Sequence, residues 1–248
     1  MSQTKINIKT PDGVADCYLF HPSGKGPWPA VIFFMDGIAI RPALLAMAER
    51  LSSNGYYVLL PDMFYRAGPY EPFDGATVFN GGPERDRLMK LMQTVNNGSA
   101  MRDTGAFLDY LAQQSMVTRS KVGCTGYCMG GRFSLLAAGT YPDRVAAAAS
   151  FHGGQLATDA PDSPHLVAPK IRGSVYVGVA GIDPHFPDAE KDRLKNALST
   201  AGVHYQLETY PNVRHGFTMT DLPVYDREAA ETHWERLLHL LGETLPHD

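Results

Sequence analysis

The sequence predicts one three-layer α/β domain over residues 1–248, with helices on both faces of a mostly parallel sheet. Continuous apolar runs of strand length recur along the chain and alternate with segments of helical apolar spacing. Strands that are apolar throughout are typical of parallel sheets, because helices bury both of their faces. The length of 248 residues and the hydrophobic content of 44% are compatible with a single large core.

The first half of the chain provides a strand-helix-strand unit and then a long loop. Segments 15–20 and 30–35 have strand patterns, and the second is uniformly apolar. The stretch 42–53 has helical spacing and ends before an Asn-Gly pair, after which 56–62 is another apolar run. Residues 63–83 are rich in Gly, Pro, Phe and Tyr without periodicity. Because loops of that length in a compact domain are usually functional or mobile, we expect this one to overhang a site.

The second half of the chain continues the alternation of helices and strands, and its crossovers should be right-handed. The expected elements are helices 84–94 and 99–114, strand 121–127, helix 129–140, strands 145–151 and 174–180, helix 187–201, strand 204–210 and a final helix near 224–241.

Charge and cysteine content bear on partners and location. A formal net charge of -4 gives no attraction to nucleic acid or anionic lipid. The N-terminus has no apolar signal core, and no segment approaches the roughly 18 apolar residues of a membrane span. Three cysteines are an odd and small set that fits a reducing compartment. We therefore expect a cytoplasmic monomer or homodimer without nucleic-acid or membrane partners.

The turn Gly126-Tyr127-Cys128-Met129-Gly130 has the pattern of a nucleophile elbow. A sharp strand-to-helix turn needs small residues two positions before and after the nucleophile, and both glycines meet that need. An apolar strand precedes Cys128 and an alanine-rich helix follows. The helix dipole favours a thiolate, and the Met129 amide can donate to an oxyanion. The pattern predicts Cys128 as a nucleophile in an α/β-hydrolase fold; the alternative is a buried structural cysteine.

A base and an acid follow the elbow in the order that α/β-hydrolases use. Free cysteine is mostly a thiol at neutral pH, so a nearby base is needed. Asp183 follows the strand 174–180, and of nine histidines only His215 lies between the last strand and the last helix. We expect His215 as the base and Asp183 as its orienting acid. The alternatives are an ordinary loop histidine and a turn-forming aspartate before proline.

The loop after strand 30–35 is expected to complete the oxyanion hole beside Met129. Gly37 can present its amide closely because it has no Cβ. Asp36, at the end of a buried strand, needs a polar partner, and we expect the Cys128 thiol to be that partner. The alternative is that Asp36 caps the helix that begins near Pro42, although five residues of separation make it a poor cap.

Several segments together resemble the dienelactone hydrolases, small α/β-hydrolases with a cysteine nucleophile. They are GYCMGG (126–131), PDMFYR (61–66), GIDPHFP (181–187) and YPNVRHGF (210–217). The resemblance runs from about residue 10 to 240 and implies Cys128 as nucleophile, His215 as base and Asp183 as acid. In that family a glutamate after the third strand bonds the resting thiol and takes its proton when substrate binds. Asp36 stands at that position.

The substrate-binding candidates come from the same resemblance. The family's arginines hold the carboxylate of dienelactone, and Arg87 resembles one of them. The other family arginine falls four residues after the histidine, where this chain has Met219. Half of the anion clamp is therefore missing, which favours a substrate other than dienelactone. Arg87 can alternatively be a solvated surface arginine. Tyr127 and His152 are further candidates for lining the pocket.

The sequence implies no cofactor and no metal. Cys124 and Cys128 are four residues apart, but no Cys or His cluster completes a zinc site, and the GxGxxG and Walker spacings are absent. The expected activity is hydrolysis of a lactone or small ester through an acyl thioester. A general small-ester or thioester hydrolase and a non-catalytic hydrolase-like binding protein remain as alternatives.

Overall fold

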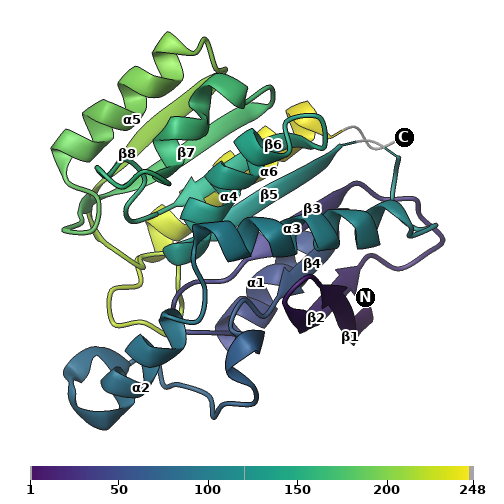
Figure 1. Cartoon of the computed structure of the whole chain (residues 1–248), viewed down its shortest axis with the longest axis horizontal. Coiled ribbons are helices and arrows are strands. Elements are labelled where there is room, and N and C mark those ends of the chain that lie inside the picture. Colours follow the sequence, from purple (N-terminus) through teal and green to yellow (C-terminus); the bar gives the residue numbers. More distant parts are fainter. Residues whose placement is uncertain (1, 120, 246–248) are drawn as a thin grey trace.

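The computed structural model describes residues 2–119 and 121–245, and its centre is an eight-stranded sheet (Figure 1). The strands are β1 (Ser2–Thr10), β2 (Gly13–His21), β3 (Ala30–Phe34), β4 (Tyr57–Pro61), β5 (Val122–Tyr127), β6 (Val145–Phe151), β7 (Ser174–Ile182) and β8 (Tyr205–Arg214). Their spatial order is β1-β2-β4-β3-β5-β6-β7-β8. β2 pairs antiparallel with β1 and β4, and all pairs from β4 to β8 are parallel. The predicted α/β fold with a mostly parallel sheet is confirmed.

Helices cover both faces of this sheet (Figure 1). They are α1 (Pro42–Ser53), α2 (Gly82–Met92), α3 (Asn97–Ala112), α4 (Met129–Thr140), α5 (Asp188–Thr200) and α6 (Arg227–Thr244), with short 3-10 turns η1 (Tyr65–Ala67), η2 (Val78–Asn80) and η3 (Pro164–Lys170). α3 and α4 pack together on one face, and α1 and α6 lie on the other. There Arg50 of α1 binds Glu231 of α6 at 2.6 Å and stacks on Trp234. Within the described ranges, no helix is long and apolar enough to cross a membrane.

The core lies between the central strands and the two helical layers. Every residue of β3, β4 and β5 is buried, as their continuous apolar runs require. At roughly 25 cal/mol per Å² of apolar surface removed from water, these strands supply much of the driving force for folding. They also place the carboxyl ends of β3 and β5 side by side, because Phe34 is in register with Gly126. The loops that leave those two ends are the ones expected to carry the elbow and the oxyanion hole.

The pattern of apolar runs does not predict strand β1. Its isoleucines alternate with polar residues such as Asn7 and Lys9, and one of its long edges is unpaired within the described sheet. An edge strand needs only one partner, so its sequence need not be apolar throughout. β1 and β2 form a hairpin around Thr10 to Gly13 that widens the sheet at one edge.

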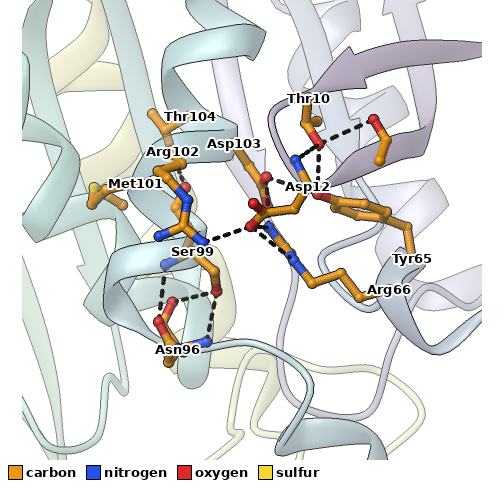
Figure 2. Close-up of polar contacts among 12 residues, drawn as sticks. Thr10, Asp12, Tyr65, Arg66, Asn96, Ser99, Met101, Arg102, Asp103 and Thr104 are labelled. Atoms are coloured by element: carbon orange, nitrogen blue, oxygen red, sulfur yellow. Dashed lines mark hydrogen bonds and ion pairs between the residues drawn. The ribbon is translucent and has the colours of Figure 1, made fainter.

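A buried polar cluster holds the start of the long loop 63–83 (Figure 2). Asp103 of α3 is fully buried and accepts from Arg66 at 2.8 Å and from the Tyr65 hydroxyl at 2.9 Å. Arg66 also binds Asp12 in the β1–β2 turn, which Arg102 of α3 contacts as well. The cluster ties the hairpin, η1 and α3 together, so the loop leaves the sheet from a fixed base.

Candidate active site

The strand-to-helix turn between β5 and α4 holds Cys128 in a strained conformation. Its φ is 54° and its ψ is -115°, a region that L-residues rarely adopt and that costs about 1–3 kcal/mol. The neighbouring glycines make the turn possible. A Cβ on Gly126 would lie 2.0 Å from the Gly130 carbonyl oxygen, and one on Gly130 would lie 2.3 Å from the Phe34 carbonyl oxygen. The structure therefore has the close backbone approach of a nucleophile elbow.

His215 and Asp183 meet beside this turn. His215 Nδ1 and Asp183 Oδ2 are 2.7 Å apart, and the Asp183 side chain is buried. The His185 backbone N–H donates to the other carboxylate oxygen at 2.8 Å, which fixes the orientation of the acid. His215 in turn forms a hydrogen bond with the Cys128 thiol. The three side chains form one hydrogen-bonded line, although they come from loops after β5, β7 and β8.

The electrostatics of this line favour charge separation between sulfur and imidazole. Burial by itself would raise the pKa of Cys128, but the charge of His215 and its hydrogen bond outweigh burial, so the pKa lies below its usual value. Burial likewise opposes protonation of His215. The Cys128 charge and the Asp183 hydrogen bond outweigh it and raise the pKa of His215 to about 10. A thiolate beside an imidazolium is the state that these surroundings stabilise.

Two backbone amides, those of Gly37 and Met129, lie at the turn that carries Cys128. The Gly37 N–H donates to the Cys128 sulfur and helps to lower its pKa. Met129 is the first residue of α4, so its N–H points out of the helix N-terminus without an intrahelical acceptor. The Met92 side chain covers Gly37 closely, since a Cβ there would lie 3.0 Å from the Met92 methyl carbon. The end of α2 thus shields the loop around Gly37 from solvent.

Asp36 binds an arginine, not the Cys128 thiol that was expected as its partner. Its Oδ1 accepts from Arg41 Nη1 at 2.7 Å and from the Ile38 N–H at 2.9 Å, and both charged side chains are 3% exposed. Arg41 also holds Asp221, on the loop after His215, through Nε and Nη2. The alternative of a helix cap is also wrong, because the N-cap of α1 is Arg41. Asp36 still lies close enough to raise the pKa of Cys128.

The structure does not bring the side chains of Tyr127 or Arg87 to His215 and Asp183. Tyr127 is fully buried, and its hydroxyl lies 3.0 Å from His233 Nε2 of α6, so its expected place in the pocket is wrong. Arg87 donates to Glu84 and to carbonyl oxygens of the long loop at Glu71 and Pro72. Its guanidinium also lies 3.9 Å from the centre of the ring of a loop phenylalanine. The described contacts of Arg87 therefore brace the long loop.

His152 lies against His215. Its ring centre is 5.1 Å from that of His215, its Nε2 is 2.8 Å from the Thr218 hydroxyl, and its side chain is almost fully buried. Burial, followed by the charge of His215, places the pKa of His152 well below its usual value. A neutral ring of this kind supports the orientation of His215 and adds no competing charge.

The other two thiols differ from Cys128. Cys17 and Cys124 are fully buried, and burial raises the pKa of each far above that of a free thiol. Burial is the main cause at both thiols, and at Cys17 nearby aspartates raise the pKa further. In the described part of the chain, no group of three or more Cys, His, Asp or Glu side chains is placed to hold a metal ion.

Two arginines near the site were not found from the sequence. Arg41 immediately precedes a helix, and Arg132 lies in the first turn of α4. Arginine is mostly exposed in proteins, so a single sequence gives no signal that either side chain turns inward. The glycines and carboxylates of the site could be identified because each lies at a fixed place in a turn or directly after a strand.

Comparison with known proteins places this geometry in a family. The model described as "Dienelactone hydrolase family" matches residues 15–245. The chain belongs to the dienelactone hydrolase family. It is therefore a hydrolase, and the predicted resemblance is confirmed.

Three members of the dienelactone hydrolase group illustrate the similarity. A Methylorubrum extorquens protein, provisionally named a carboxymethylenebutenolidase, is 27% identical over 236 residues, or 94% of this chain and 78% of that protein. A Rhodococcus opacus carboxymethylenebutenolidase is 25% identical over 231 residues, or 92% and 86%. The crystal structure of a dienelactone hydrolase-like promiscuous phosphotriesterase from metagenomic libraries superposes with a TM-score of 0.79 at 25% identity, and the match covers 99% and 100% of the chains.

Proposed function

We propose that the protein hydrolyses a lactone or a small carboxylic ester through an acyl thioester on Cys128. The observation that supports it most is the line from Cys128 through His215 to Asp183, in which the pKa of the thiol is lowered and that of the imidazole is raised. A poised thiolate in a strained turn, beside a histidine oriented by a buried acid, is the arrangement of an activated nucleophile.

The first half of the reaction is acylation of Cys128. The thiolate attacks the carbonyl carbon, and the carbonyl electron pair moves to oxygen, where the amides of Gly37 and Met129 donate hydrogen bonds. The carbonyl re-forms as the C–O bond breaks, and the His215 imidazolium gives its proton to the departing oxygen. Removing one such oxyanion donor typically costs about 3–4 kcal/mol of activation free energy.

The second half is hydrolysis of the thioester. Neutral His215, oriented by Asp183, takes a proton from water as the water oxygen attacks the acyl carbon. The tetrahedral intermediate collapses, the Cys128 thiolate leaves, and the product acid is released. The resting thiolate and imidazolium are thereby restored. Asp36 positions the oxyanion loop in this proposal, because its carboxylate accepts from the Ile38 N–H.

The surroundings of Arg87 favour a substrate other than dienelactone. Its guanidinium donates to Glu84 and to two loop carbonyl oxygens, and a buried Met219 stands where the family's other arginine would lie. A general small-ester or thioester hydrolase is therefore the second candidate function. The non-catalytic binding protein would require Cys128 to be unreactive.

A trapping experiment tests the proposed function. Wild type, C128A and the matched thiol control C124A are incubated with a panel of 4-nitrophenyl esters, a thioester and a lactone, then quenched in acid and analysed by mass spectrometry. We expect turnover and an acyl mass on the Cys128 peptide in wild type and C124A, and neither in C128A. Full esterase rates in folded C128A would reject Cys128 as the nucleophile. Absence of any turnover, together with a thiol inert to iodoacetamide, would favour the binding protein.

A further inference from the structure

Residues 152–155, His-Gly-Gly-Gln, lie between the start of α4 and the loop 183–187 that carries Asp183. They follow β6, and both non-glycine residues have a positive φ, 37° at His152 and 58° at Gln155. This left-handed region is unfavourable for residues with a Cβ and persists only where the surroundings hold it. Strain of this kind gathers at functional sites, so the contacts that hold the segment bear on the chemistry next to it.

The two glycines of this segment allow close packing on both of its neighbours. A Cβ on Gly131 of α4 would lie 3.1 Å from the Gly153 Cα. A Cβ on Gly154 would lie 3.1 Å from the His185 Cβ. α4 therefore packs against one side of the segment, and the loop 183–187 packs against the other. The position of that loop relative to the elbow depends on the segment between them.

Hydrogen bonds extend this contact from α4 to the carboxylate of Asp183. Arg132 Nη1, in the first turn of α4, donates to the Gln155 Oε1 at 2.5 Å. The Gln155 backbone N–H donates to the His185 carbonyl oxygen at 3.0 Å. The His185 backbone N–H donates to Asp183 Oδ1 at 2.8 Å, and the other carboxylate oxygen lies 2.7 Å from His215 Nδ1. Three hydrogen bonds thus join Arg132 to the carboxylate that orients His215.

Arg132 is committed to Gln155. In the described part of the chain the guanidinium forms no ion pair, its Nε is buried without a partner, and Gln155 accepts its one hydrogen bond. Hydrogen bonds with a charged donor are about twice as strong as neutral ones, so this contact restrains the Gln155 side chain. Both residues line a polar hollow of about 430 Å³ that Cys128 and His215 do not line. The pair therefore lies outside the place where a bond would be cleaved.

We propose that Arg132 and Gln155 are positioning residues, whose bond fixes the loop 183–187 so that Asp183 keeps its alignment with the imidazole. The inference rests on the proposed function, because it names what holds the reacting groups in place. Neither side chain contacts the substrate or transfers a proton. The pair acts on the charge separation between Cys128 and His215, since the Asp183 hydrogen bond is one of the contacts that keep the imidazole protonated.

The titration of Cys128 tests the proposal in two variants that break the bond differently. R132M removes the donor. Q155N keeps a residue that tolerates the left-handed backbone, but its side chain is shorter and no longer reaches Arg132. In both we expect the pH midpoint of Cys128 alkylation by iodoacetamide to rise by about half a unit or more, because a displaced Asp183 stabilises the imidazolium less. The kcat/KM for 4-nitrophenyl acetate should fall about tenfold.

Further variants separate the bond from charge and from general bracing of the segment. Q155E keeps an acceptor for Arg132 and should retain the wild-type midpoint, and R132K keeps a charged donor and should recover part of it. R193M removes another arginine of this region, one that donates to the Ala157 carbonyl oxygen at 2.8 Å, and should leave the midpoint unchanged. A rise in R132M with a wild-type midpoint in Q155N would overturn the proposal, because the guanidinium would then act only by its charge.

A proton resonance separates failure of this inference from failure of the proposed function. The proton between His215 Nδ1 and Asp183 Oδ2 should give a far-downfield signal in wild type and in R193M. We expect that signal to shift or to vanish in R132M and Q155N at a temperature where both variants are folded. The measurement needs no ester, so its expected outcome in a protein without ester turnover would reject the function alone. An unchanged signal and an unchanged alkylation midpoint in folded Q155N would overturn the role of the pair.

Discussion

Cys128 and Cys17 both lie among carboxylates, yet the two thiols are driven in opposite directions. Burial, then Asp62, Asp16 and Asp103, raises the pKa of Cys17. At Cys128 burial and Asp36 act in the same sense, but His215 and the Gly37 amide prevail and the pKa is lowered. Cys17 is fully buried and Cys128 only partly, but the pKa of Cys128 falls because His215 and the Gly37 amide outweigh burial.

The difference lies in how each nearby carboxylate is neutralised. Beside Cys128, Asp36 has a buried arginine of its own, Arg41, so that little uncompensated negative charge faces the sulfur. Near Cys17, Asp103 is paired with Arg66, but among the described residues only burial and aspartates act on the pKa of the thiol, and all of them raise it. The Arg66–Asp103 pair thus has a structural role. In our proposal the similar Arg41–Asp36 pair also affects the reactive thiol.

The largest effect should come from removing His215, the side chain that lowers the pKa of Cys128. H215Q should lower ester turnover by about 1000-fold or more, because it removes both the base and the group that stabilises the thiolate. Thiolate absorbance at 240 nm and the rate of iodoacetamide alkylation at pH 7 should fall with it. H239Q changes an exposed histidine of α6 and serves as the control. Retained alkylation in H215Q would show that Cys128 is activated by another group.

The pH dependence of the unfolding free energy should reflect the coupled titration of Cys128 and His215. The pKa of His215 is raised from 6.5 to about 10, so its contribution is fully present below about pH 6.5 and is lost as pH rises through about 10. The pKa of Cys128 is lowered from 9.0, so its contribution is present above about pH 9 and is lost as pH falls through the folded value. The two slopes cancel where they overlap, which leaves a plateau whose upper limit is about pH 9.

Urea unfolding of wild type and C128A from pH 5 to pH 10 measures this plateau. The difference in unfolding free energy between them should be constant over the plateau that ends near pH 9. Above about pH 9 it should shrink by at most about 1.4 kcal/mol per pH unit, the limit for one proton, because His215 alone then titrates. The same series for C17A should run parallel to wild type up to about pH 8 and should gain on wild type above about pH 9, because the folded Cys17 thiol keeps its proton where the unfolded thiol loses it. A difference that does not shrink above about pH 9 would argue against the coupled pair.

Removing Arg41 should affect both stability and the reactive thiol. R41M leaves Asp36 buried without its counter-charge, which costs about 3 kcal/mol or more. The unopposed carboxylate should raise the pKa of Cys128, so the pH midpoint of alkylation should move upward. The double variant R41M/D36N removes the unpaired charge and should return the midpoint toward wild type. Destabilisation of R41M without any change in the alkylation profile would show that Asp36 does not act on the sulfur.

What the sequence predicts here depends on how local the determining interactions are. Uniformly apolar strands such as β4 and the glycine spacing around Cys128 are local features, and each was predicted. Arg41 and Asp221 are 180 residues apart, so no sequence pattern announces their pairing. Tyr127 was misplaced for a related reason. Every position of β5 is buried, so the run gives no alternation to show that this ring faces α6 and not the pocket.

The smallest effect should come from breaking the equivalent pair near Cys17. R66M leaves Asp103 without its arginine, but the Tyr65 hydroxyl still donates to the carboxylate and the lost arginine was partly exposed. We therefore expect a loss of about 2 kcal/mol in urea unfolding, less than for R41M. The alkylation midpoint of Cys128 should not move, because this cluster binds the β1–β2 turn, η1 and α3 instead of the elbow (Figure 2). A shifted midpoint in R66M would mean that the two regions are coupled through the long loop, and that the separation between a structural and a chemical arginine does not hold.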